Sequence, residues 1–238
     1  MTLASPPVPL PSVAAALEAV RPGATLMVGG FGLVGAPLTL IEGLLEHPGA
    51  RDLTIISNNL GEPGKGLGLL LRQGKVKKVI GSYFTSNREV GEAYLRGELE
   101  VQLMPQGSMS ESIRAGGAGI GGYFTRTGVG TELAKDKEIR IIDGETYLLE
   151  KPLKANVALI KAAKSDKLGN LVYYKTARNF NPIMATAADY VIAEVDEIVE
   201  TGQLPPELIV TPHLYVDAVV LSTIFLTSEG VASNGGRD

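Results

Sequence analysis

Three glycine-rich segments contain the residue types in this chain that are best suited to chemistry. The first follows a short apolar run and reads Gly29-Gly30-Phe31-Gly32-Leu33-Val34-Gly35-Ala36-Pro37. The second reads Gly61-Glu62-Pro63-Gly64-Lys65-Gly66-Leu67-Gly68, and the third joins Gln106-Gly107-Ser108 to the run Arg114–Gly122. Glycine allows positive φ and a close approach of the main chain to a ligand, so these segments predict sites built largely from backbone groups.

The first segment matches the pattern G-x-G-x-x-G through Gly30, Gly32 and Gly35. A dinucleotide site of this kind expects an acidic residue at the end of the second strand, where it would hold the ribose hydroxyls. That position is occupied by Ser57-Asn58-Asn59, and Asp52 lies at the start of the strand instead. The sequence therefore disfavours a nicotinamide or flavin site, and leaves open a turn that only packs a strand against a helix.

The other two segments lack the partners that familiar catalytic motifs require. Lys65 is followed by Gly66, so the hydroxyl that holds magnesium in a P-loop is absent, and alone this segment predicts a surface loop. Ser108 has no G-x-S-x-G elbow around it and no histidine nearby, which argues against a serine hydrolase. The chain has no cysteine, and its two histidines, His47 and His213, lie far apart, so neither a thiolate nucleophile nor a metal site is expected.

Composition narrows the classes of partner. Of the 238 residues, 45% are hydrophobic and 20% are charged, which is typical of a folded globular chain. The net charge of −4 and the lack of a basic block argue against a nucleic-acid partner. The uncharged stretch 24–41 contains four glycines and one proline, which disfavours a membrane-spanning helix. No Lys or Arg precedes Arg21, so a secretory leader is not expected and we predict a cytoplasmic protein.

The elements that position these segments are predicted to alternate between short apolar strands and helices. Ser12 is placed to cap a short helix that runs through Val20. The expected strands are Thr25–Val28, Leu53–Ile56, Val76–Ile80, Leu99–Leu103, Ile139–Ile142, Val157–Ala163 and Tyr190–Val195. The expected helices are Leu38–Glu46, Gly66–Gln73, Arg88–Arg96 and Ser108–Ala115.

This alternation predicts an α/β fold with a mainly parallel sheet and helices on both faces. From Ile139 onward strands dominate, which indicates an additional β-rich, antiparallel C-terminal lobe. We expect one domain over residues 1–238, with an extended arm at residues 1–11 and a loose tail at residues 229–238.

Several ordered motifs give a more specific indication. They are Met27–Gly32 with Gly35 and Pro37, Pro105–Gly107, Ile113–Gly119, Thr127–Thr131, Gly169–Tyr173 and Thr176–Pro182. In this order and spacing, over about residues 22–219, they resemble the first (alpha) subunit of family I coenzyme A transferases, of the 3-oxoacid type. Two positions depart from the family: Leu38 stands where an acidic or hydroxyl residue is frequent, and Gly121-Gly122 where Pro-Ala is frequent. Both differences could alter the acyl-group preference.

The resemblance implies an enzyme that moves coenzyme A from an acyl-CoA, such as succinyl-CoA, to a 3-oxo acid or another short carboxylic acid. In the family, the nucleophile is a glutamate in a Ser-Glu-Asn-Gly-like motif of the second subunit. No Glu-Asn-Gly occurs in this chain, and Ser228-Glu229-Gly230 lacks the asparagine. Glu62 lies in a loop, and Glu111 is expected to form a capping box with Ser108, so neither is expected to replace that nucleophile. We therefore predict no catalytic residue in this chain.

The same resemblance implies the CoA-transferase fold of the NagB/RpiA type and a complex with a second subunit, in two copies of each. Coenzyme A thioester is expected as a substrate, with no permanently bound cofactor. Main-chain N–H groups of the first segment, and the helix N-terminus that follows it, are expected to face the ligand. Gln106 is expected to hold the acyl or thioester carbonyl; the alternative is an ordinary polar residue in solvent. Asn59 is a weaker candidate, and the predicted substrate-binding residues are Gly29, Gly30, Phe31, Gly32, Leu33, Val34, Gly35, Asn58 and Gln106.

Two other functional classes remain open from the sequence. A metabolite sensor on the same kind of fold would bind its ligand with no second subunit present, and it would exchange no label between acids. A sugar-phosphate isomerase would need an acid–base pair within its own chain, and no convincing pair is evident. A transferase half should instead expose a large apolar face and require its partner. The sequence does not specify the donor and acceptor acids.

Overall fold

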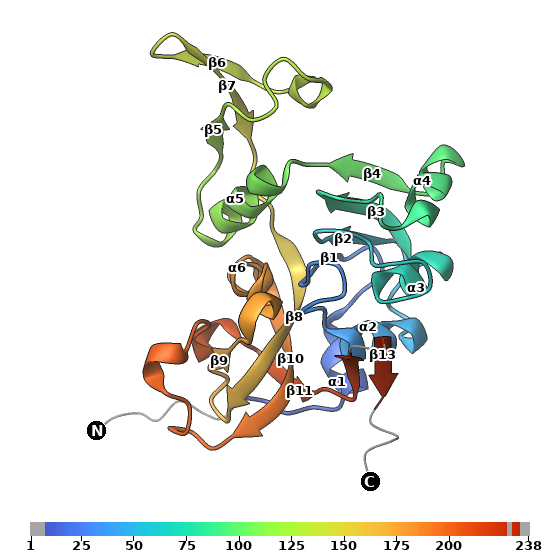
Figure 1. Ribbon diagram of the computed structural model, residues 1–238, viewed down its shortest axis with the longest axis vertical. Helices are drawn as coiled ribbons and strands as arrows, with labels where there is room; N and C mark the ends of the chain where they lie inside the picture. Colours follow the sequence, from blue (N-terminus) through green and yellow to red (C-terminus); the bar gives the residue numbers. More distant parts are fainter. Residues whose placement is uncertain (1–7, 228–229, 234–238) are drawn as a thin grey trace.

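A twisted parallel sheet organises the protein (Figure 1). The computed structural model describes residues 8–227 and 230–233. In the sheet, the strand order is β11-β10-β8-β1-β2-β3-β4, and every neighbouring pair in this order is parallel. The strands are β1 (Thr25–Val28), β2 (Leu53–Ile56), β3 (Val76–Gly81), β4 (Glu100–Leu103), β8 (Ala155–Asp166), β10 (Ala188–Val199) and β11 (Ala218–Leu221). A short strand, β9 (Leu171–Val172), pairs antiparallel with β8.

Apolar side chains on both faces of the central strands explain why they are buried in the middle of the fold. In β1, Leu26 and Val28 enter one apolar core, whereas Met27 enters the other. The same alternation holds in β8, where Leu159 faces the first core and Ile160 the second. Near-continuous apolar strands of this kind are typical of parallel sheets that are covered on both sides.

Helices cover both faces, as the sequence predicted. The first face is covered by α1 (Val13–Ala16), α2 (Leu38–Glu46), α3 (Leu67–Arg72) and α4 (Arg88–Leu95), which bring residues such as Leu40 and Leu44 into the first core. The second face is covered by α5 (Gln106–Gly117) and α6 (Asn181–Ala185), through Met109, Ile113 and Met184. The chain begins with the predicted cap, since the Ser12 side chain accepts a hydrogen bond from the Ala15 N–H.

The order of the strands creates a switch point between β1 and β8. From β1 the chain proceeds through β2, β3 and β4 on one side, whereas β8, β10 and β11 lie on the other. All seven strands point the same way, so the segments that follow them meet at one edge of the sheet. In open α/β sheets, the crevice outside the carboxyl ends at such a point is the usual ligand site.

Two antiparallel additions complete the fold and, with the parallel sheet, confirm the predicted fold class. Strands β5 (Tyr123–Thr125), β7 (Glu145–Glu150) and β6 (Ile139–Ile142) form an arm that projects away from the main sheet (Figure 1). The second addition is the hairpin of β12 (Ile224–Thr227) and β13 (Gly230–Ser233), with β12 packed against α2. The strands β8, β10 and β11 join the parallel sheet and are not part of a separate lobe, because each continues its hydrogen-bond ladder.

Two local predictions need correction. Residues 230–233 of the expected loose tail form β13, because they pair along their length with β12; residues 229 and 234–238 lie outside the described residues. The helix expected at Ser108–Ala115 begins at Gln106, with Pro105 as its N-cap, so the Ser108–Glu111 capping box is wrong. Of the expected arm, residues 8–11 run outside helices and strands, with the Val8 N–H bonded to the Lys167 carbonyl.

Short 3₁₀ helices occupy several of the connections. They are Leu17–Ala19, Glu132–Ala134, Lys175–Arg178, Pro206–Leu208 and His213–Tyr215. No helix among the described residues is both long enough and apolar enough to cross a membrane.

The buried Tyr173 lies at the start of the segment that leads from β9 to α6, and its hydroxyl lies 2.7 Å from the Thr211 hydroxyl. Burial raises the pKa of Tyr173 from 10.0 to about 12, against a smaller lowering by the hydrogen bond with Thr211. The unfolded chain therefore loses this proton first as the pH rises. The associated stability is fully present below pH 10 and is lost as the pH rises through the folded pKa of about 12.

We expect Tyr173→Phe to narrow the difference in unfolding free energy from the unchanged protein by roughly 2–3 kcal/mol between pH 10 and pH 12. Urea titrations at several pH values measure this difference. Tyr94→Phe, at an exposed position on α4, controls for the loss of a hydroxyl. A difference that stays constant over this range would contradict the buried environment of Tyr173.

Candidate active site

The structure brings two predicted site residues into direct contact. Asn58 follows β2 and is 1% exposed, and its Nδ2 donates to the Oε1 of Gln106 at 3.2 Å. The same amide nitrogen donates to the Ser82 hydroxyl, which follows β3, at 2.9 Å. Segments that follow β2, β3 and β4 are thus joined at the carboxyl edge. The Gln106 side chain is exposed, and its amide NH₂ group has no partner among the described residues, so it is free to donate to a carbonyl oxygen.

The glycine loop, defined as residues 29–35, follows β1 at the same edge. Its centre is a tight turn, in which the N–H and carbonyl groups of Phe31 and Val34 bond to each other in both directions. Positive φ values of 121°, 63° and 70° at Gly30, Gly32 and Gly35 explain why the turn requires glycine. Leu33 is buried beneath the turn, whereas the Phe31 and Val34 side chains are 51% and 40% exposed.

The glycine loop offers fewer main-chain donors than its sequence predicts. The Gly29 N–H bonds to the Leu159 carbonyl, and the Gly30 N–H bonds to the Asn179 side chain at 3.0 Å. Only the N–H groups of Gly32, Leu33 and Gly35 in the loop lack a partner among the described residues. The predicted set Gly29–Gly35 therefore divides into residues that hold the loop and residues whose N–H groups remain available.

Two asparagines that sequence reasoning did not single out hold the glycine loop. Besides accepting from Gly30, Asn179 donates through Nδ2 to the Val34 carbonyl at 3.0 Å. The fully buried Asn181 donates to the Gly35 carbonyl at 3.0 Å, and its Oδ1 accepts from the Lys161 N–H at 2.9 Å. Both lie in the segment Thr176–Pro182, where the sequence offered only a motif and no sign of its contact with the loop.

The helix N-terminus that follows the glycine loop does not face a ligand, contrary to expectation. The Leu38 and Ile41 N–H groups bond to the carbonyls of Ala36 and Pro37. The Thr39 and Leu40 N–H groups both bond to one carboxylate oxygen of the buried Glu194, at 2.9 and 3.2 Å. All four donors of the first turn of α2 are therefore satisfied within the chain, and the electrostatic potential of this helix end is directed at Glu194.

The N-terminus of α5 is the open one. The N–H groups of Gln106, Gly107 and Ser108 have no hydrogen-bond partner within residues 8–227 and 230–233. The Ser108 side chain is 5% exposed, and its hydroxyl likewise has no partner in that part of the chain. Free donors at the start of a twelve-residue helix favour a carboxylate or a developing oxyanion.

Neither acidic residue considered from the sequence has the environment of a carboxylate nucleophile. Glu62 is half-exposed and lies 3.5 Å from Lys65. Glu111 is paired with Arg114 at 2.6 Å, and this hydrogen bond lowers the pKa of Glu111. A carboxylate nucleophile needs a desolvated position facing the substrate. The absence of a catalytic residue from this chain remains a prediction.

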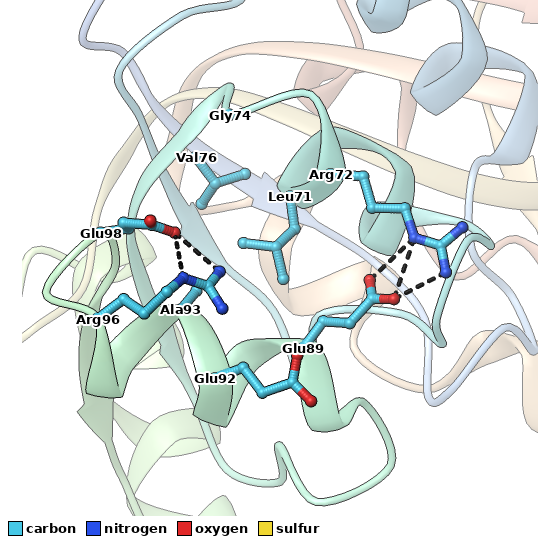
Figure 2. A pocket seen from close by; sticks show the side chains of 9 residues that line it. All are labelled: Leu71, Arg72, Gly74, Val76, Glu89, Glu92, Ala93, Arg96 and Glu98. Carbon is cyan, nitrogen blue, oxygen red and sulfur yellow. Dashed lines mark hydrogen bonds and ion pairs between the residues drawn. The ribbon is translucent and has the colours of Figure 1, made fainter.

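A cavity of about 610 Å³ between α3 and α4 lies away from this edge (Figure 2). Its wall includes Val76, the first residue of β3, so it opens at the amino end of the sheet. Its charged side chains are already paired, Arg72 with Glu89 at 2.7 Å and Arg96 with Glu98 at 2.8 Å. These features give it no role in the arrangement above. Among the described residues, no group of three or more His, Asp or Glu side chains could hold a metal ion.

Gly29→Ala tests the contact between the glycine loop and Asn181. A Cβ atom at residue 29 would lie 2.7 Å from Asn181 Cγ, so the asparagine must move and release the Gly35 carbonyl. We expect a loss of roughly 1–3 kcal/mol in unfolding free energy, measured by urea denaturation. Gly91→Ala, on α4 with no atom within 4 Å of the new Cβ, is the control and should leave stability equal or slightly higher. Equal stabilities for the two variants would contradict the proposed contact.

Comparison with known proteins adds independent evidence. The family model described as Coenzyme A transferase matches residues 11–222. The chain is 52% identical to the first subunit of the 3-oxoadipate CoA-transferase of Pseudomonas putida over 211 residues, covering 88% of this chain and 91% of the relative. It is 50% identical to the alpha subunit of the acetate CoA-transferase of Escherichia coli K12 over 202 residues, covering 85% and 91%.

Solved structures show the same fold. The acyl-CoA transferase of Escherichia coli O157:H7, solved as a thioester complex with CoA, superposes with a TM-score of 0.81 at 23% identity. The match covers 98% of this chain and 49% of the other, so the chain spans about half the length of that protein. Together with the extent of the family match, these similarities show that the chain belongs to the coenzyme A transferase family.

Proposed function

We propose that this chain is the first subunit of a heteromeric CoA-transferase. It would move coenzyme A between an acyl-CoA, such as succinyl-CoA, and a 3-oxo acid or another short carboxylic acid. The observation that carries the proposal is the meeting, at one sheet edge, of the free Gln106 amide with unpartnered main-chain N–H groups. The relatives described above are named for 3-oxoadipate or acetate, and they support the reaction class without deciding between the acids.

The reaction requires a carboxylate nucleophile, which we assign to a second subunit. That glutamate would attack the thioester carbonyl of the donor and expel the CoA thiolate, leaving an acyl-glutamyl anhydride. The thiolate would then attack the glutamyl carbonyl and release the donor acid, leaving a glutamyl-CoA thioester. The acceptor carboxylate completes the exchange by the same steps in reverse. Coenzyme A is therefore a substrate and leaves with the product.

This chain would supply donors for the oxygen that becomes negatively charged in each step. The Gln106 Oε1 is held by Asn58, which leaves Nε2 directed by that contact to donate to an acyl or thioester carbonyl. The free N–H groups of Gly32, Leu33 and Gly35 would contact the CoA or acyl portion. The exposed Phe31 and Val34 side chains would cover the apolar part of the substrate and exclude water, which would otherwise hydrolyse the anhydride.

The other functional classes lack a supporting observation. An isomerase would need a paired acid and base at the carboxyl edge, whereas Glu62 and Glu111 are paired with adjacent cations. A sensor would need a site that is complete within one chain. The site described here has donors but no accessible nucleophile, as expected for one wall of a shared cleft.

Purification of the tagged chain from its own cells tests the complex. We expect a second subunit of similar size to co-purify in two copies of each, as measured by native mass spectrometry. The complex should exchange CoA between succinyl-CoA and a 3-oxo acid, and removal of the second subunit should abolish the exchange. Exchange by the isolated chain would place the nucleophile in this chain and disprove the assignment above.

Gln106→Ala in the reconstituted complex tests the proposed donor. We expect kcat/KM for exchange to fall by about 10²–10³, the range for loss of one preorganised oxyanion donor, with the stability of the complex unchanged. Gln106→Glu should fall at least as far, because a carboxylate would oppose the developing negative charge. Gln102→Ala, at an exposed position on β4, is the control. Full activity of Gln106→Ala would remove this residue from the site.

A further inference from the structure

Glu194 is a completely buried carboxylate to which the chemistry above gives no role. It is 0% exposed, and both of its oxygens are engaged. One oxygen accepts the Thr39 and Leu40 N–H groups, as described above. The other accepts from the Ser222 hydroxyl at 3.0 Å and lies 3.6 Å from the Lys161 ammonium. A buried carboxylate is costly unless it is paired and hydrogen-bonded, and this one is both.

Strand register places Glu194 beside the start of the glycine loop. Val28, the last residue of β1, pairs with Leu159 of β8. Lys161 lies two residues further along β8 and pairs with Glu194 of β10. Alternate residues of a strand face the same side, so Lys161 and Glu194 point toward the face covered by α2, as Leu159 does. The carboxylate therefore stands at the carboxyl edge, beneath the end of the loop.

The connection from this carboxylate to the glycine loop is short. Only Ala36 and Pro37 separate Gly35 from the first turn of α2, where Glu194 accepts its two N–H groups. The hydroxyl of Thr39 in that turn also accepts the N–H groups of Thr223 and Ile224, at 2.9 and 3.1 Å. The exit of the loop is thus fastened to β10 and to the segment after β11. Asn179 and Asn181 hold the body of the loop from the other side.

We propose that Glu194 is a positioning residue for CoA transfer, which fixes the exit of the glycine loop through the first turn of α2. Its negative charge occupies the positive end of that helix, so the substrate is left to the donors of α5 and of the loop itself. Charge-assisted hydrogen bonds from two adjacent N–H groups to one oxygen define the position of the turn more tightly than solvent could. The residue does not touch substrate. This inference rests on the function proposed above.

Two substitutions separate reach from charge. Glu194→Asp keeps the charge beside Lys161 but withdraws the oxygen by one methylene from Thr39 and Leu40. Glu194→Gln keeps an oxygen within reach, and Lys161 retains Asp196 as a second partner at 2.5 Å. If Glu194 positions the loop, Glu194→Gln should keep kcat within about threefold, whereas Glu194→Asp should lose at least about tenfold in kcat with little change in KM, because a small misplacement of catalytic donors is costly.

Hydrogen exchange of the same complexes measures the loop without reference to activity. Peptides covering residues 29–41 should exchange faster in Glu194→Asp and at the unchanged rate in Glu194→Gln. Asp166→Asn is the matched control, because Asp166 is also a buried carboxylate, one of whose oxygens accepts the N–H groups of Leu168, Gly169 and Asn170 at the far end of β8. This variant should lose stability with no change in kcat or in the exchange of residues 29–41.

The inference fails if Glu194→Asp matches Asp166→Asn in both readouts, because Glu194 then contributes stability alone. It also fails if Glu194→Gln is the more impaired of the two variants, since the charge and not the reach would then matter. An unchanged complex without any transferase activity would overturn the proposed function only. Exchange of residues 29–41 would still decide whether Glu194 positions the loop.

Discussion

A loop made largely of glycine has few side chains with which to hold its own shape, and the proposed site depends on how the surrounding structure does so. Hydrogen bonds from side chains distant in sequence replace the missing contacts. Asn179 and Asn181 bond to main-chain groups at Gly30, Val34 and Gly35. Without these contacts the flexible loop would lose conformational entropy whenever it bound a substrate.

The parallel sheet explains why these contacts form in one place. The segments after β1, β2, β3 and β4 emerge at a single edge, and β8 places Lys161 against the same edge from the other side of the switch point. Antiparallel pairing would have sent alternate segments to opposite ends. The edge collects amide donors from the glycine loop, from Gln106 and from the first turn of α5, and the rest of the fold keeps them in register.

Two helix N-termini at this edge have different roles. The first turn of α2 is satisfied by Glu194 and by local carbonyls, and it serves to hold the chain. The first turn of α5 retains free N–H groups beside Gln106. A buried charge at one helix end therefore leaves a single region of positive potential for a negatively charged substrate or intermediate. Such an arrangement supplies electrophilic assistance and leaves the nucleophile to a second subunit.

The sequence by itself determined the alternation of strands and helices, the parallel sheet and the location of the glycine loop, because these follow from local periodicity and from glycine itself. It also indicated Asn58 and Gln106 as members of one site, since residues after parallel strands share an edge. Only the tertiary structure decided which donors remain free. The partners of Gly30 and Thr39 lie 149 and 155 residues away, at Asn179 and Glu194, and no local pattern marks them. A hydrogen bond between such distant segments depends on strand order and register, which the packing of the whole chain sets.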